Sequence, residues 1–272
     1  MIANFQGMIR LVFSLSIVLF IAPLALLAQD YELPGNQKFS LGVKAGPSVT
    51  FGAYPDKELR DQFDALPKLG FGGGLFISFP LKKQFSFLAE GGYALRGRKV
   101  KLANGGFVNN QTYQFAEMSM ALRRSFNLKV FKNIPSKWFI NVGPNIAYWV
   151  NGKGKFVETK YDIKFNVPPD GNLYVNYLTN PNRWLFGIDV GVGVDAPINR
   201  RQKIRIELRA TLGQTYLGKK NSSSTYASLS WEDTLKTNLK TISLTGAYTL
   251  DFDKRASKMG KSTMDKTKKK KR

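Results

Sequence analysis

The residues best suited to chemistry in this sequence are acidic and basic side chains, because the chain contains no histidine and no cysteine. This excludes serine–histidine dyads and triads, imidazole bases, thiol nucleophiles and the usual zinc ligands. Glu90 and Glu117 could form a carboxylate pair. We expect a structural ion cluster instead of glycoside chemistry, because three basic residues are expected nearby, namely Arg96, Arg98 and Arg123. The sequence therefore predicts a protein without enzymatic activity, metal or cofactor.

The elements that would position these charges show alternating hydrophobicity. Residues 203–213 read KIRIELRATLG, in which isoleucine and leucine alternate with arginine and glutamate. Successive side chains of a strand project to opposite faces, so one face of this segment is apolar and the other is charged. A soluble sandwich would bury the apolar face, whereas a transmembrane barrel turns it towards lipid and encloses the polar face.

About eight such segments follow one another, over residues 39–51, 68–81, 85–100, 113–130, 138–150, 184–196, 203–213 and 239–252. Long and short connections alternate between them, and aromatic residues gather at the strand ends, as in the interfacial girdles of membrane barrels. The longest connection, 151–182, contains Pro168-Pro169-Asp170-Gly171 and predicts a hairpin that extends the fifth and sixth strands. Together these features favour a single eight-stranded antiparallel transmembrane β-barrel, an all-β fold with short periplasmic turns and long extracellular loops.

The inward positions of these strands carry charges of both signs. We expect them to form a lumen ion network whose members are Lys44, Glu90, Arg96, Arg98, Glu117, Arg123, Asp189, Asp195, Arg205, Glu207 and Arg209. The network could line a selective pore or a proton path, or it could fill the interior structurally. A lumen enclosed by about eight strands is just wide enough for side chains to fill, which favours the structural role. Arg124 departs from the alternation, which predicts either a β-bulge or a side chain reaching towards lipid headgroups.

The first 29 residues have the layout of a secretory signal peptide. Arg10 precedes the apolar run 11–22, and small residues precede Asp30. The alternative is a retained transmembrane anchor, since residues 9–28 are long enough to span a bilayer. The predicted organisation is a signal peptide at 1–29, a short periplasmic segment at 30–38, the barrel at 39–252 and a basic periplasmic tail at 253–272. Because the sequence contains no cysteine, both a lipoprotein anchor and a disulfide are excluded.

The formal net charge of +22 at first suggests a nucleic-acid partner. However, residues 253–272 alone hold 10 Lys and Arg against 2 Asp, a net charge of +8. An exported chain has little access to nucleic acid, and no nucleic-acid-binding motif is present. The expected partners are therefore anionic groups of the cell envelope, such as lipopolysaccharide phosphates in the outer-membrane lipid, acidic peptidoglycan or acidic protein surfaces.

Several stretches resemble the PorT-like outer-membrane β-barrel family. They are LGVKAGPSVTF, FGGGLFISFPLKKQFSFLAEGGYALRGRK, YQFAEMSMALRRSF, WFINVGPNIAYWV and FGIDVGVGVD, and they span about residues 39–252. A G-x-K-x-G first strand, here Gly42–Gly46, recurs in that family. The resemblance implies an integral outer-membrane protein related to a component of the type IX secretion and gliding system. The familiar outer-membrane barrel enzymes, namely acyltransferases, deacylases, phospholipases and omptin-like proteases, rely on a histidine, so this chain does not resemble them.

Three functions remain open at this stage. The first is an accessory or scaffold barrel of a type IX-like secretion machinery, whose partners would be other envelope proteins of that machinery. Its basic tail would then dock a partner through Lys266, Lys268, Lys269, Lys270, Lys271 and Arg272, or would serve only as a solubilising end. The second is a passive structural or small-solute, porin-like barrel. The third is a surface adhesin that binds through the loops at 151–182 and 218–237.

Overall fold

The structure, a computed structural model, describes most of the chain between residues 38 and 253. The described ranges are 38–81, 84–102, 108–131, 134–170, 172, 174–199, 201–213, 215–226, 229–233 and 235–253. Lys38–Phe252 form one compact unit. The predicted signal peptide and nearly all of the basic tail lie outside the described residues. Within the described ranges, no helix is long and apolar enough to cross a membrane.

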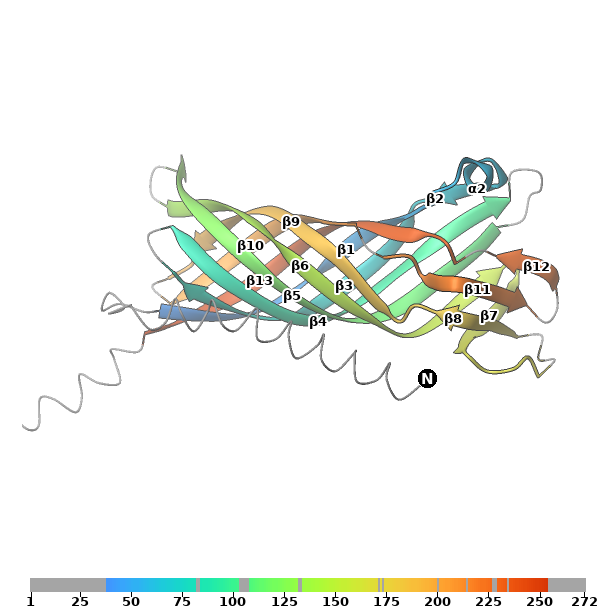
Figure 1. The fold of residues 1–272 in the computed structure, drawn as a ribbon. Helices are drawn as coiled ribbons and strands as arrows, with labels where there is room; N and C mark the ends of the chain where they lie inside the picture. Colours follow the sequence, from blue (N-terminus) through green and yellow to red (C-terminus); the bar gives the residue numbers. More distant parts are fainter. Residues whose placement is uncertain are drawn as a thin grey trace, which may run out of the picture. The chain divides into compact units, whose positions relative to one another are not determined.

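Eight long strands form a closed ring (Figure 1). They are β1 (Lys38–Ala53), β3 (Lys68–Pro80), β4 (Phe85–Leu102), β5 (Val108–Phe131), β6 (Ile134–Phe156), β9 (Trp184–Pro197), β10 (Gln202–Leu212) and β13 (Asn238–Asp253). They are hydrogen-bonded in that order, and β13 returns to β1. The registers from β1 through to β13 are antiparallel. The predicted eight-stranded antiparallel barrel is thereby confirmed.

The seam between β1 and β13 closes the ring. Thr50 Oγ1 and Thr241 Oγ1 lie 3.3 Å apart across it, and the rings of Phe39 and Phe252 stack with centroids 5.0 Å apart. A Cβ atom on Gly46 would lie 2.0 Å from the carbonyl oxygen of Leu244. Only glycine therefore allows the two backbones to approach so closely at this point.

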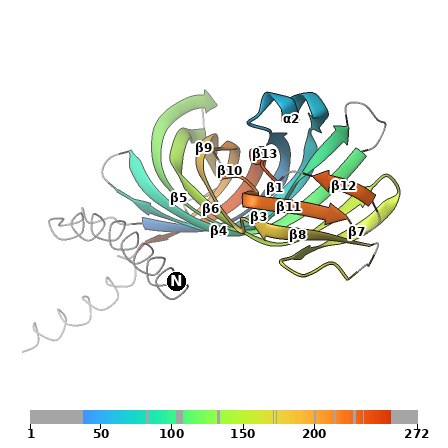
Figure 2. The ribbon, with the colours of Figure 1, turned by 45° about the vertical axis from the view of Figure 1, so that its right-hand side comes forward.

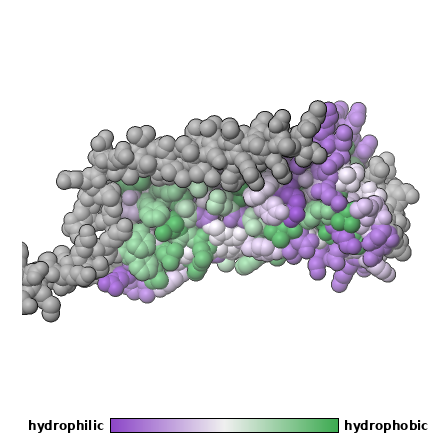
Figure 3. Space-filling view, turned by 60° about the horizontal axis from the view of Figure 1, so that its bottom comes forward, coloured by the Kyte–Doolittle hydropathy of each residue, from purple (hydrophilic) through white to green (hydrophobic). Residues whose placement is uncertain are grey.

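The two faces of the strands differ as the alternation predicts. Ile206 is 59% exposed on the outer face, whereas its neighbours Arg205 and Glu207 are 4% and 1% exposed in the lumen. Hydrophobic side chains gather on the outer wall of the barrel, and hydrophilic ones gather towards its ends (Figure 3). The outer wall thus has the composition of a lipid-facing surface.

The two ends of the barrel are built differently (Figure 2). At the turn end, the connections between β3 and β4, β5 and β6, and β9 and β10 are short. At the loop end, the connections between β1 and β3, β6 and β9, and β10 and β13 contain further elements, namely α2 (Lys57–Gln62), β2 (Phe63–Leu66), β7 (Thr159–Phe165), β8 (Val175–Pro181), β11 (Gly218–Tyr226) and β12 (Leu229–Asp233). Their pairing continues the sheet beyond the ring in the order β6-β7-β8-β11-β12, while β2 pairs with β4.

The long connection between β6 and β9 differs from the predicted hairpin. The chain turns at Val157-Glu158, where Phe156 pairs with Thr159 and β6 with β7. Pro168–Asp170 lies instead in the connection between β7 and β8, which are parallel. The prediction was wrong because it relied on proline and glycine as turn signals, whereas the actual turn has neither residue.

Arg124 lies on a regular part of β5, opposite Phe85 and Ile140. The described β5–β6 register is shifted elsewhere, between Gln114 and Phe115 and between Leu128 and Phe131. Of the two predictions for this residue, the bulge is therefore wrong. The side chain is exposed on the outer wall.

Candidate functional site

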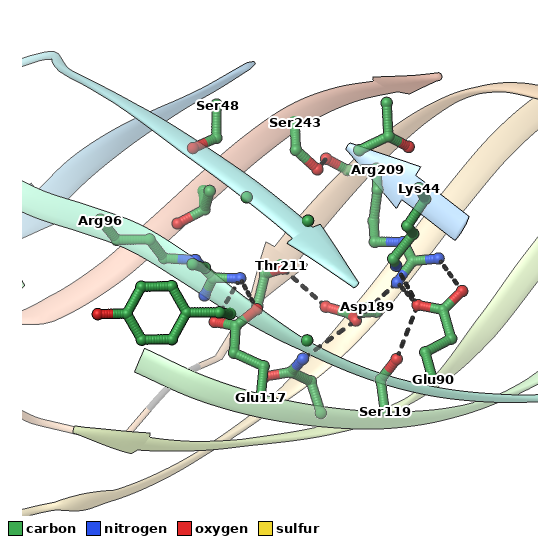
Figure 4. A pocket seen from close by; sticks show the side chains of 18 of the residues that line it. Lys44, Ser48, Glu90, Arg96, Glu117, Ser119, Asp189, Arg209, Thr211 and Ser243 are labelled. Carbon is green, nitrogen blue, oxygen red and sulfur yellow. Dashed lines mark hydrogen bonds and ion pairs between the residues drawn. The ribbon is translucent and has the colours of Figure 1, made fainter. Parts of the chain in front are cut away.

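The lumen of the barrel holds a cluster of buried charges at mid-height, centred on Arg209 of β10 (Figure 4). Arg209 Nη2 lies 2.8 Å from Glu90 Oε1, and its Nε donates to Glu207 Oε1 at 2.6 Å. Arg209 Nη1 lies 3.4 Å from Asp189 Oδ2. One guanidinium therefore contacts three carboxylates.

The contact between Glu90 and Arg209 crosses the bore. Glu90 belongs to β4 and Arg209 to β10, and three strands separate these two in either direction around the ring. Lys44 of β1 also pairs with Glu90, and Ser119 of β5 donates to it at 3.1 Å. Side chains from three other strands thus converge on this carboxylate of β4 in the middle of the lumen.

Asp189 is held by neutral groups as well as by Arg209. Thr211 Oγ1 donates to Asp189 Oδ1 at 2.7 Å, and Asn145 Nδ2 donates to Asp189 Oδ2 at 3.3 Å. Asp189 is 3% exposed. Such hydrogen bonds offset part of the cost of burying the carboxylate.

A second group of charges lies nearer the turn end. Arg205 binds Asp195 through Nε at 2.7 Å and Nη2 at 3.3 Å. Arg123 lies 3.8 Å from both Asp195 and Glu207, so the second group joins the first through Glu207. The guanidinium of Arg123 also stacks 3.9 Å above the ring of Phe139.

The remaining predicted members lie towards the loop end. Arg96 binds Glu117, with Nη2 2.8 Å from Oε1, so Glu90 and Glu117 bind different cations. Arg98 Nε donates to Gln111 at 2.6 Å and to Tyr113 at 2.9 Å. Arg98 therefore lies at the edge of the cluster that is nearer the loop end, beside the aromatic residue Tyr113.

Sequence reasoning missed several polar members. Lys203 pairs with Asp251 at 2.6 Å, and Ser40 donates to Asp251 at 2.7 Å, which adds a further ion pair near the turn end. Asn141 donates to Glu207 at 3.2 Å. All of these residues have inward parity on their strands, so the alternation that identified the arginines could have identified them too.

A small cavity of about 70 Å³ lies within the first group. Its lining carries three cations and three anions, namely Lys44, Arg96, Arg209, Glu90, Glu117 and Asp189. This volume suits roughly five water molecules. It is well below the several hundred Å³ of a typical small-molecule site.

Apolar side chains close the lumen on both sides of these charges. At the loop end lies the loop-end apolar cluster, which comprises Tyr113, Phe115, Ala147, Trp149, Tyr161, Ile163, Leu178, Leu185, Leu217, Leu235 and Leu239. At the turn end, Phe76, Leu88, Ala121 and Ala247 form a smaller cluster. Arg205 stacks 4.6 Å above the ring of Phe76 and so connects this smaller cluster to the charges.

The arrangement is suited to filling the bore and holding opposite walls together. Its carboxylates are bound by guanidinium, ammonium, hydroxyl or amide groups, as in a structural ion network. The docking residues predicted in the tail, Lys266 and 268–272, lie outside the described residues.

Comparison with known proteins identifies one family model. It is described as an outer membrane protein beta-barrel domain, and it matches residues 27–215. The comparison with curated proteins gave no match.

Solved structures of outer-membrane proteins are similar to this chain at low identity. OprG from Pseudomonas aeruginosa is 10% identical, with a TM-score of 0.46, over 80% of this chain and 96% of that one. Neisserial surface protein A is 10% identical, with a TM-score of 0.43, over 79% of this chain and 97% of that one. The outer membrane protease OmpT from Escherichia coli is 11% identical, with a TM-score of 0.32, over 81% and 97%.

Proposed function

Since the chain belongs to the outer membrane protein beta-barrel domain family, and is thus an outer-membrane β-barrel, we propose that it acts as a closed, non-enzymatic scaffold in that membrane. In this role the barrel anchors the protein, and its two ends make the functional contacts. Its interior serves stability and carries no flow of solute.

The contact between Glu90 and Arg209 across the bore carries this proposal. It ties opposite walls of the barrel together and crosses the path that an aqueous channel along the bore would have to take. An eight-stranded barrel has little interior space beyond its own side chains. The loop-end apolar cluster adds a second obstruction, because Trp149, Leu185 and Leu239 within it are fully buried.

Single-channel recording in planar lipid bilayers tests the closed state. The purified full-length protein should insert without producing steady current, whereas an open porin recorded in the same apparatus should conduct. A steady open current would overturn the proposal and favour the alternative of a small-solute, porin-like barrel. The observation that favours this alternative is the polar cavity beside Arg209.

The machinery that the scaffold serves is proposed to be a protein secretion system of the type IX kind. The support is the resemblance of the first strand, with Gly42, Lys44 and Gly46, and of the following hairpin to the PorT-like family. Deleting the gene should impair export of substrate proteins, and restoring the intact chain should recover it. Normal export after deletion would overturn this role while leaving the closed barrel intact.

The basic tail is proposed as the docking site for an envelope partner. It is attached to β13 and has a net charge of +8 over residues 253–272. A chain that lacks residues 254–272 should insert normally but should no longer co-purify with its partners from solubilised envelopes. Unchanged co-purification would show that the tail is only a solubilising end.

A surface adhesin is the second alternative, because the loop-end elements expose apolar side chains. Tyr174 is 64% exposed and Val167 is 45% exposed. If the protein were an adhesin, replacing residues 166–174 with a short polar linker would abolish binding to host or neighbouring cells. Under the scaffold proposal, the same replacement leaves cell binding unchanged.

A further inference from the structure

Arg124 is a charged residue on the lipid-facing wall of the barrel. It lies on β5 between Phe85 of β4 and Ile140 of β6, both of which are exposed hydrophobic residues. Towards the centre of the wall, the next outward pair is Leu122 and Val142, which are 46% and 49% exposed. The guanidinium therefore borders directly on the hydrocarbon region.

Aromatic rings hold this guanidinium in place. Its central carbon lies 4.9 Å from the ring centroid of Phe126 and 5.5 Å from that of Phe85. Phe126 itself stacks on Trp138, with centroids 4.3 Å apart, one step nearer the turns. Arg124 thus lies within an aromatic belt, at the depth where lipid headgroups begin.

A second ring-stacked arginine, Arg183, lies in the connection between β8 and β9 and shows what Arg124 lacks. Arg183 stacks 4.6 Å from the ring of Tyr148, and it donates Nε to the carbonyl of Trp149 at 2.9 Å and Nη2 to that of Val150 at 3.2 Å. Arg124 has the same kind of ring contacts. Among the residues that the structure describes, however, it has neither an acidic partner nor a hydrogen-bond acceptor.

A guanidinium has five N–H donors and stays charged, so without an acceptor it is unfavourable beside hydrocarbon. At this depth, the anionic acceptor available is the phosphate of a lipid headgroup. The planar fork of arginine matches two phosphate oxygens, which a lysine cannot reproduce. We propose that Arg124, together with Phe85, Phe126 and Trp138, binds a phospholipid in the leaflet at the turn end, with the guanidinium contacting the lipid phosphate.

Native mass spectrometry of the full-length protein in maltoside micelles tests this site, with phosphatidylglycerol as the added lipid. Arg124→Gln should reduce the apparent affinity for the first bound lipid by about tenfold, the size expected for a charge-assisted contact. Arg201→Gln is the matched control, because Arg201 is also an exposed arginine at the turn end but lies in a turn. It should bind the lipid as the wild type does. Arg124→Lys should give an intermediate affinity.

Two further additions identify the group that is recognised. Diacylglycerol, which has the acyl chains but no phosphate, should bind equally weakly to the wild type and to Arg124→Gln. Inorganic phosphate should fail to displace the lipid, because the site needs acyl chains against Phe85 and Phe126. Equal phosphatidylglycerol affinity in wild type and Arg124→Gln would overturn the proposal. So would displacement by inorganic phosphate, which would indicate a free-anion site.

Discussion

The middle of the barrel lumen and its loop end are both filled, but with opposite kinds of side chain. The middle holds the lumen ion network around Arg209, whereas the loop end holds the apolar cluster around Trp149. The network joins residues of the barrel wall only. The apolar cluster also includes Leu178, Leu217 and Leu235 from the loop-end elements and their connections.

This difference separates two tasks. Ion pairs that cross the bore tie opposite strands together, and a buried pair is disrupted strongly when one partner is removed. An apolar cluster gains free energy from the area it removes from water, so it can fasten loop elements onto the end of a barrel. The barrel and its loop-end structure should therefore be separable by mutation.

The largest effect is expected from replacing Arg209 with methionine. The change leaves Glu90, Asp189 and Glu207 without their shared cation, and removing one partner of a buried ion pair costs about 3–5 kcal/mol. Urea unfolding in detergent micelles should show this as a lower midpoint for the whole barrel. A midpoint equal to that of the wild type would contradict a central role for Arg209.

A double variant shows whether the loss comes from unpaired charge. Adding Glu90→Leu to Arg209→Met removes one of the carboxylates left unpaired, so part of the lost stability should return. If the loss of stability in the double variant equalled the sum of the losses caused by Arg209→Met and Glu90→Leu alone, Glu90 and Arg209 would not be energetically coupled.

Trp149→Ala should have the next largest effect, but at the loop end. Trp149 is fully buried, and it contacts Tyr113 at a centroid distance of 4.6 Å and Phe165 at 5.0 Å. Removing a buried aromatic ring costs about 3–5 kcal/mol where the site cannot collapse, and less where loops can move inward. Limited proteolysis should cleave residues 159–181 faster, while the transmembrane strands stay protected. Equal protection of both regions would mean that the two are not separable.

The lumen ion network and the loop-end apolar cluster also differ in how far the sequence could predict them. The network residues follow from strict alternation, because a charge between two lipid-facing residues, such as Glu207 between Ile206 and Leu208, must face the lumen. Local sequence therefore predicts which residues enter the lumen. It does not predict which acid meets which base, since Glu90 and Arg209 are 119 residues apart.

The loop-end apolar cluster could not be predicted in this way. Phe115 and Trp149 have inward parity, but a hydrophobic residue in a membrane strand is ordinarily assigned to the lipid face. Their partners come from β7, β8 and the connections near β11 and β12, and β7 and β8 pair in parallel. Parallel pairing depends on a crossover, so no adjacent turn signal announces it.

A pH dependence should appear at the loop end. The Tyr177 hydroxyl donates to Asp170, and this hydrogen bond is the main cause that lowers the pKa of Asp170 below its usual range. The stabilisation is therefore present above the unfolded pKa of about 3.9 and is lost as the pH falls through the lower folded value. Amide exchange of residues 159–181, corrected for its intrinsic pH dependence, should accelerate below about pH 3.9. Asp170→Asn should remove this acceleration, and a variant that kept it would exclude Asp170 as the cause.

The smallest effect on stability is expected from removing an exposed ion pair at the loop end. Lys236 Nζ lies 2.7 Å from Asp56 Oδ2, with the two side chains 55% and 48% exposed. The hydrogen bond to Asp56 raises the pKa of Lys236, so its stabilisation is present below the ordinary lysine pKa and lost as the pH rises through the raised value. Because solvent screens such a pair, Lys236→Gln should leave the urea midpoint unchanged.

The adjacent Thr237, which is fully buried and donates to the carbonyl of Ala53 at 3.2 Å, offers the matched contrast. Thr237→Ala should lower the loop-end stability by about 1 kcal/mol. If Lys236→Gln had the larger effect of the two, burial would not be what determines stability at this end.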